Sequence, residues 1–342
     1  MYIDPHVHCR DGEKESYKET IRHALYVAER AGATAIFDMP NTKPAVKKTG
    51  HVIERIKLAK RTGSPVFYGT YIGATPDEAQ LSEAVLCYDG FEQVVGFKMY
   101  AGKSVGDIEV VKEEDQRRVY KKLAQLGYKG VLVVHCEKQS LIDDKIWTPD
   151  TPVSHAFARP PEAEVESVND QIKFAKEAGF EGTLHVAHIS LPESVEIVKD
   201  ARDKLRITCG VTPHHILFDY TRMSEEDGIL YKMNPPLREP GTNTEMLQLL
   251  EEGAIDWIES DHAPHTYAEK TSDSYMSGVP WLHAYPRFLK WLERNGFSIE
   301  QLDDLTFNNI KRTFEPKLKN LRRRKVQPNM NIYNEYAFDP MQ

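Results

Sequence analysis

Cysteines and long apolar runs are scarce in this sequence, and each scarcity excludes a class of protein. The 342 residues include only four cysteines, and no two of them form a Cys-x-x-Cys pair. A disulfide framework is therefore not expected, and free thiols in apolar segments fit the reducing cytoplasm. No segment of about 18 apolar residues occurs, and the first residues form neither a basic nor an apolar leader. We therefore expect neither a membrane span nor a signal peptide.

Basic residues are also fewer than acidic ones. The formal net charge is -8, with 44 lysines and arginines against 52 aspartates and glutamates. An extended basic surface for nucleic acid is therefore not expected. The basic run at residues 322–325 is local, and we interpret it as a solvated surface segment.

The sequence does contain a regular alternation of two kinds of segment. Apolar segments of strand length alternate with longer segments whose apolar residues recur at helical spacing, and most of the longer ones end near glycine. The expected strands cover residues 2–10, 34–38, 66–72, 94–100, 130–136, 183–189, 206–211 and 255–260. The expected helices cover residues 16–32, 51–63, 76–90, 113–127, 161–179, 191–204, 243–253, 279–296 and 298–314.

This alternation predicts the fold class. Apolar strands between helices indicate a parallel sheet covered on both faces, and eight such units predict an α/β fold, the (β/α)8 TIM barrel. We expect the barrel to span residues 1–316. Residues 317–342 should form a C-terminal extension that packs on the barrel or trails from it.

Ionisable residues gather at the expected carboxyl ends of the strands, where barrel enzymes place their active sites. His6 and His8 alternate on the first strand, so both imidazoles would face one side and suit a metal. The candidate ligands are His6, His8, Lys98, His135, His188 and Asp261. Each has a plain alternative, such as a packed histidine or an N-capping aspartate. Six such coincidences at equivalent strand ends would be needed, so we predict a metal site.

Lys98 is the unusual member of this set, because an ammonium inside an apolar strand is costly without a partner. Burial lowers the pKa of a lysine and leaves a nucleophilic amine. Two roles are then open. The amine could form a Schiff base with a substrate, or it could react with carbon dioxide to give a carbamate that bridges two metals. The carbamate hypothesis also explains why histidines that can bind metals lie at the neighbouring strand ends.

The ordered set of motifs resembles the amidohydrolase superfamily and, within it, the dihydroorotase family over nearly the whole chain. The matching segments are Asp4-Pro5-His6-Val7-His8-Cys9-Arg10, Met39-Pro40-Asn41-Thr42, Lys98-Met99-Tyr100, Val134-His135-Cys136-Glu137, His185-Val186-Ala187-His188, Thr212-Pro213-His214-His215, Asn234-Pro235-Pro236-Leu237-Arg238 and Ser260-Asp261-His262-Ala263-Pro264-His265. The His-x-His pair alone is a weak signal, whereas the ordered set is specific.

The resemblance implies a role for each matching residue. His6, His8 and Asp261 would hold one zinc ion, and His135 and His188 a second. A carboxylated Lys98 and a hydroxide would bridge the two ions, and Asp261 would also act as the catalytic base. The substrate-binding residues would be Arg10, Asn41 and His265 for an α-carboxylate, and Asn234 and Gly278 for a pyrimidine ring.

The implied activity is the reversible cyclisation of N-carbamoyl-L-aspartate to dihydroorotate in pyrimidine biosynthesis. The expected partner is this small-molecule substrate, without nucleic acid or membrane. A homodimer is left open, and so is the question whether the polar loop 102–106 is a lid. Many relatives carry an additional small β domain; this chain begins at the first barrel strand, so we expect none.

Two alternatives remain at this stage. The first is another cyclic amidohydrolase, of the allantoinase or hydantoinase type, whose substrates lack the carboxylate that Arg10 would bind. The second is a non-catalytic homologue that keeps the barrel as a scaffold. Such a protein typically loses metal ligands, whereas all six are present here.

Overall fold

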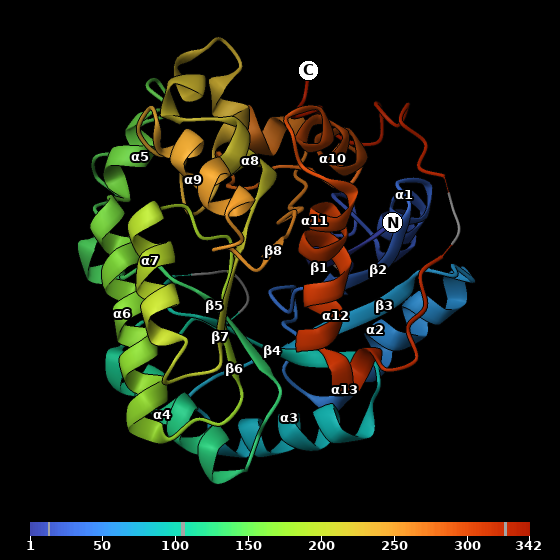
Figure 1. Cartoon of the computed structure of the whole chain (residues 1–342), viewed down its shortest axis with the longest axis vertical. Helices are drawn as coiled ribbons and strands as arrows, with labels where there is room; N and C mark the ends of the chain where they lie inside the picture. Colours follow the sequence, from blue (N-terminus) through green and yellow to red (C-terminus); the bar gives the residue numbers. More distant parts are fainter. Residues whose placement is uncertain (13, 104–106, 325–326) are drawn as a thin grey trace.

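The structure, a computed structural model, describes residues 1–12, 14–103, 107–324 and 327–342 and forms an eight-stranded barrel (Figure 1). All eight strands run parallel and pair in chain order, β1 to β8. The strands are β1 Tyr2–Val7, β2 Ala33–Asp38, β3 Phe67–Gly73, β4 Val94–Tyr100, β5 Val131–His135, β6 Thr183–Val186, β7 Ile207–Val211 and β8 Trp257–Ile258. The predicted (β/α)8 barrel is confirmed.

Residues beyond β8 complete the barrel at its first strand. β8 has only two residues, shorter than the predicted 255–260, but Val7 forms a parallel bridge with His262. The backbone N–H of His8 donates to the carbonyl of His262 at 2.8 Å. This seam brings the chain around residue 261 beside the end of β1.

Helices cover the outside of the barrel, as Figure 1 shows. The longer ones are α1 Ile21–Arg30, α2 Thr49–Thr62, α3 Glu78–Gly90, α4 Glu113–Gln125, α6 Pro161–Ala178, α7 Pro192–Ala201, α9 Thr242–Glu251 and α10 Tyr285–Arg294. The shorter α-helices are α5 Ser154–Ala158, α8 Pro213–Leu217, α11 Ile299–Asp303, α12 Asn309–Thr313 and α13 Glu315–Leu318. The 3-10 and π-helical turns are η1 Gln139–Leu141, η2 Tyr220–Ser224, η3 Gly228–Tyr231, η4 Glu269–Asp273 and η5 Asp304–Asn308.

Several predicted boundaries differ from the structure for local reasons. α1 begins at Ile21 and not at residue 16, because the Thr20 side chain accepts a hydrogen bond from His23 N and caps the helix. α10 begins at Tyr285 and not at 279, since Val279 pairs with His262. The single helix predicted over 298–314 is divided into α11, η5 and α12.

Two apolar layers build the interior. One lies between the sheet and the helices, and the other fills the barrel itself. Phe314, next to α13, enters the second layer, and its ring lies 5.2 Å from that of Phe37 and 6.1 Å from that of Trp257. Aromatic side chains therefore fill this end of the barrel.

The C-terminal residues follow the surface back toward the start of the chain. Asn329 N donates to Arg30 O at 2.8 Å, Ile332 is buried, and the ring of Tyr336 lies 4.7 Å from that of His262. Residues 104–106 of the loop considered as a lid lie outside the described part of the chain. Among the described residues, no helix combines the length and apolar character that crossing a membrane requires.

Candidate active site

Three predicted ligands meet at the seam between β8 and β1. The ligand atoms of His6, His8 and Asp261 lie within 4.8 Å of one another. One carboxylate oxygen of Asp261 lies 3.2 Å from His6 Nε2 and 3.1 Å from His8 Nε2. Because strand side chains alternate, His6 and His8 face the same side, as predicted. Two imidazoles and a carboxylate form a donor set that suits a divalent metal.

The other two predicted histidines form a second pair beside the first group. His135, the last residue of β5, has its Nδ1 3.1 Å from Nε2 of His188. The ring of His188 lies 5.2 Å from that of His6, so the pair borders the three-ligand group. All the predicted histidine ligands therefore converge at one mouth of the barrel.

Lys98, on β4, is completely buried, and its charge helps to lower the pKa of His6, His8 and His188. Its Nζ has no hydrogen-bond partner among the described residues. Burial lowers the pKa of Lys98 to about 8, and the charges of Glu259 and Asp261 oppose that shift. The orphaned amine is the observation that best fits a missing group, because a bound metal or a carbamate would give it a role.

The charges of the cluster perturb one another. Burial, with the charge of Lys98 next, lowers the pKa of His6 to about 4, so its imidazole is neutral at pH 7 and can coordinate a metal. Burial raises the pKa of Asp261, whereas His6 and Lys98 favour its ionised form. These shifts are typical of a functional site.

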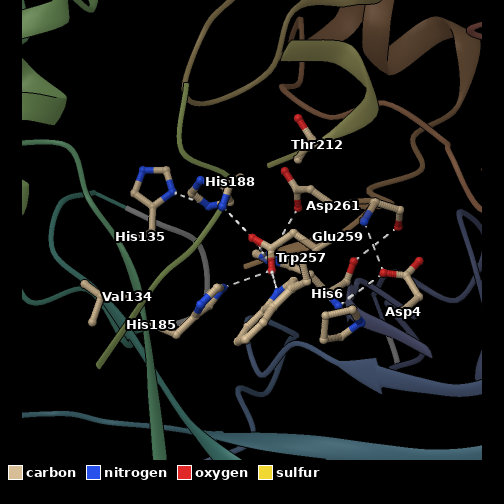
Figure 2. Close-up of polar contacts among 12 residues, drawn as sticks. Asp4, His6, Val134, His135, His185, His188, Thr212, Trp257, Glu259 and Asp261 are labelled. Atoms are coloured by element: carbon tan, nitrogen blue, oxygen red, sulfur yellow. Dashed lines mark hydrogen bonds and ion pairs between the residues drawn. The ribbon is translucent and has the colours of Figure 1, made fainter. Parts of the chain in front are cut away.

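Glu259, which was not predicted from the sequence, contacts residues of both ligand groups (Figure 2). One of its carboxylate oxygens lies 3.5 Å from His6 Nδ1 and accepts the backbone N–H of His188. The other oxygen accepts from Trp257 Nε1 at 3.3 Å and lies 3.2 Å from His185 Nε2. The carboxylate thus orients one ligand of each group. His185 stacks on Trp257 and does not line the pocket.

Glu137 supports His135 in the same way. It lies 2.8 Å from His135 Nε2, which leaves Nδ1 directed at His188. Arg159 donates two hydrogen bonds to Glu137, at 2.9 and 2.5 Å, and fixes the carboxylate. Glu137 belongs to the matching segment Val134-His135-Cys136-Glu137, but no role was predicted for it.

Five of the six metal-ligand candidates, all except Lys98, line a cavity of about 130 Å³, and every predicted substrate-binding residue lines it too. Arg10 is buried, and its Nη2 lies 3.1 Å from His265 Nε2. Asn41 Oδ1 lies 2.8 Å from His8 Nδ1. Asn234 and Gly278 line the same cavity. The further lining residues are Glu15, Tyr100, Lys103, Ala263, Met276 and Ser277.

Three residues that line the cavity have left-handed backbone conformations, which residues other than glycine rarely adopt. The φ angles are 48° at Arg10, 39° at His188 and 45° at Asp261. Each residue lies just beyond the end of its strand, where the turn redirects the side chain toward the cavity. Such strain persists where the surrounding structure holds it, and it concentrates at functional sites.

The chain is similar in sequence to curated dihydroorotases. A dihydroorotase of Methanosphaera stadtmanae is 32% identical over 317 residues, which cover 90% of this chain and 68% of that protein. A dihydroorotase of Halobacterium salinarum is 31% identical over 316 residues, covering 90% of this chain and 69% of that protein. No protein-family model matches the chain.

Solved structures with similar folds are hydantoinases. L-hydantoinase from Arthrobacter aurescens superposes with a TM-score of 0.81 at 26% identity, over 92% of this chain and 70% of that one. A D-hydantoinase, at a TM-score of 0.78 and 20% identity, shows the fold alone. Given sequence identity above 30% across nine-tenths of its length, together with this barrel, the chain belongs to the dihydroorotase family of metal-dependent cyclic amide hydrolases.

Proposed function

We propose that this dihydroorotase-family enzyme interconverts dihydroorotate and N-carbamoyl-L-aspartate with the aid of two zinc ions. His6, His8 and Asp261 would hold one ion, and His135 and His188 the other, with a carboxylated Lys98 between them. The observation that carries the proposal is the buried Lys98 amine, which has no hydrogen-bond partner among the described residues and lies 5.1 Å from the centre of the Tyr100 ring, near five residues of ligand type. A carbamate on that amine would replace a buried cation with two oxygens that share one negative charge.

When bound, the metals would supply a water of lowered pKa and a positive charge that polarises the substrate amide carbonyl. The chain's own residues do the rest. Asp261 would accept the proton of the attacking water and return it to the leaving amide nitrogen. The position of its carboxylate at the cavity, within 3.2 Å of two imidazoles, supports this role.

The substrate carboxylate would bind at Arg10, His265 and Asn41, which line the same cavity. Arg10 offers a planar fork to a carboxylate, and its contact with His265 at 3.1 Å supports a pocket in which both meet the same anion. Asn41 would complete that pocket. Asn234 and the backbone at Gly278 would bind the ring, since both line the cavity on the side of the loops after β7 and β8.

Metal content and activity test the proposal together. Purified protein should contain between one and two equivalents of zinc, should hydrolyse dihydroorotate, and should lose activity on chelation. Full activity after exhaustive removal of metal would contradict it. Hydantoin, assayed in parallel, separates this activity from that of the structurally similar hydantoinases.

The carbamate has a test of its own. Lys98→Ala should lose zinc as well as activity, by about 10³-fold or more, because the variant removes a ligand and not only a charge. Native mass spectrometry of the wild type should show the added carboxylate. A free Lys98 amine in a fully loaded, active enzyme would exclude the bridge, and borohydride trapping with substrate would support the Schiff base instead.

Three further features remain proposals. We propose that residues 1–316 form the catalytic barrel and 317–342 an extension on it. We propose a cytoplasmic location, supported by four buried cysteines that are all free. The homodimer stays a hypothesis, and solution mass measurement tests it.

A further inference from the structure

A second buried lysine lies behind the cavity, outside the metal-ligand cluster. Lys270, in the turn η4, is only 1% exposed. Its Nζ donates to three backbone carbonyl oxygens: Lys232 O at 2.9 Å, Met276 O at 3.0 Å and Gly278 O at 2.8 Å. Burial, and next the charge of Lys232, lower the pKa of Lys270. Three acceptors match the three N–H groups of an ammonium.

These carbonyls belong to the two loops that close one side of the cavity. Met276 and Gly278 line it directly, and Lys232 precedes the lining residue Asn234 by two positions. Gly278 N also donates to Lys232 O at 2.9 Å, so the two loops touch where Lys270 holds them. Lys270 itself does not line the cavity. The loops therefore lie between the ammonium and the substrate space.

The hydrogen bond from Lys270 to the Met276 carbonyl also fixes the direction of the next backbone N–H, that of Ser277. The Met276–Ser277 peptide is trans, so its carbonyl and its N–H point in opposite directions. Since Lys270 binds the Met276 carbonyl from behind, the Ser277 N–H is directed away from Lys270. Ser277 lines the cavity. A backbone N–H there is a donor for a carbonyl oxygen of a bound molecule.

We propose that Lys270 is a positioning residue for substrate binding: it fixes the 232–234 and 276–278 loops so that the donors of Ser277 and Asn234 meet carbonyl oxygens of a ureide substrate. The inference rests on the proposed function, because it takes dihydroorotate as the ligand of this cavity. It assigns Lys270 to binding, not to metal capture or to proton transfer.

The chain offers a matched control. Lys317, on α13, is also buried, and its Nζ donates to the carbonyl of Phe91 at 3.1 Å and to that of Tyr88. Neither acceptor lines the cavity. Lys270→Met and Lys317→Met each remove a buried ammonium from backbone carbonyls, but only the first removes it from the cavity wall.

The experiment measures kcat, KM for dihydroorotate, zinc content and thermal stability in the wild type and both variants. Both variants should lose stability. Lys270→Met should raise KM about tenfold or more while kcat changes less and zinc content stays at the wild-type level, because misplaced binding groups weaken positioning. Lys317→Met should keep the wild-type KM. If Lys270→Met does not fold, Lys270→Gln is measured in its place. Because it keeps two N–H donors, it should raise KM above the wild-type value but by less than about tenfold.

The results distinguish a failure of the proposed function from a failure of the positioning role of Lys270. A wild type that contains metal but does not hydrolyse dihydroorotate would overturn the proposed function. An active wild type combined with an unchanged KM in a folded Lys270 variant would overturn the positioning role alone. An equal rise in KM in Lys317→Met would also overturn it, because the effect would then follow from lost stability.

Discussion

At the scale of single residues, Arg10 is the group that should distinguish a carboxylated substrate from a neutral one. Its guanidinium lies at the cavity wall against His265 and is not among the metal-ligand candidates. Its backbone is left-handed, and the turn that imposes this conformation also aims the side chain at the cavity. Its role can therefore be tested apart from the metal.

Arg10→Met should lower kcat/KM for dihydroorotate by about 10²-fold or more, since a desolvated, charge-assisted hydrogen bond contributes about 1.5–3 kcal/mol and each 1.4 kcal/mol is tenfold. Steady-state kinetics and zinc analysis measure the effect, and zinc content should stay near that of the wild type. Dihydrouracil, which lacks the carboxylate, is the control substrate and should be nearly unaffected. An equal loss on both substrates would mean that Arg10 supports the fold or the metal site.

Residue-level prediction from sequence was most specific where the chemistry was unusual for its surroundings. Lys98 was singled out because a charge in an apolar strand needs a reason, and in the structure its amine is buried without a hydrogen-bond partner among the described residues. Glu259 carries the same signal, since it follows the apolar pair Trp257-Ile258, but it was not among the predicted site residues. Lys270 gave no such signal, because its neighbours in sequence are polar and only the folded loops bury it.

At the scale of secondary-structure elements, periodic segments were predictable and the loops between them were not. All eight strands and the helices between them lie near their predicted positions, because burial on a sheet or helix face leaves a period in the sequence. The segment between β5 and α6, which contains η1 and α5, has no such period and was missed. The loops that form the cavity wall are of this second kind.

The loop after β8 contains a glycine whose conformation can be tested. Gly278 has a φ of +146°, and a Cβ added there would lie 2.5 Å from the carbonyl oxygen of Ala263. Gly278→Ala should therefore shift the loop, destabilise the protein by about 2–3 kcal/mol and raise KM for dihydroorotate. Urea unfolding and steady-state kinetics measure the two effects.

Gly253→Ala is the matched control for this substitution. Its φ is +75°, but an added Cβ would meet nothing within 4 Å. It should cost about 1 kcal/mol from backbone strain alone and leave KM unchanged. If both glycine variants behaved alike, close approach to Ala263 would not be what the position requires.

At the scale of the whole molecule, the C-terminal segment returns to the first helix. His23 on α1 lies between Glu19 and Glu335, with Nδ1 2.8 Å from Glu19 and Nε2 3.2 Å from Glu335. Nearby, Asp339 forms an ion pair with Arg287 on α10. The His23–Glu335 contact joins residues 312 positions apart, and the His23 contacts should make stability depend on pH.

The hydrogen bond to Glu19 is the main cause that raises the pKa of His23 to about 9 in the folded protein. The unfolded value is about 6.5. A group whose pKa is higher in the folded state stabilises fully below the unfolded pKa, and this contribution is lost as pH rises through the folded pKa. The pKa of Glu19 is lowered to about 2, so its carboxylate stays ionised throughout this window.

His23→Gln should therefore destabilise the protein at pH 6 and have little effect at pH 10. Because the His23 side chain is one-third exposed, solvent screening keeps the difference to about 1 kcal/mol or less. Urea unfolding at pH 6, 8 and 10 measures it, and the His23 ring signals in NMR should titrate near pH 9. Glu335→Gln is the control: it leaves Glu19, the main cause, in place and should remove only part of the effect. A destabilisation that is equal at all three pH values would show that packing against Tyr336, and not the charge of His23, joins the two ends of the chain.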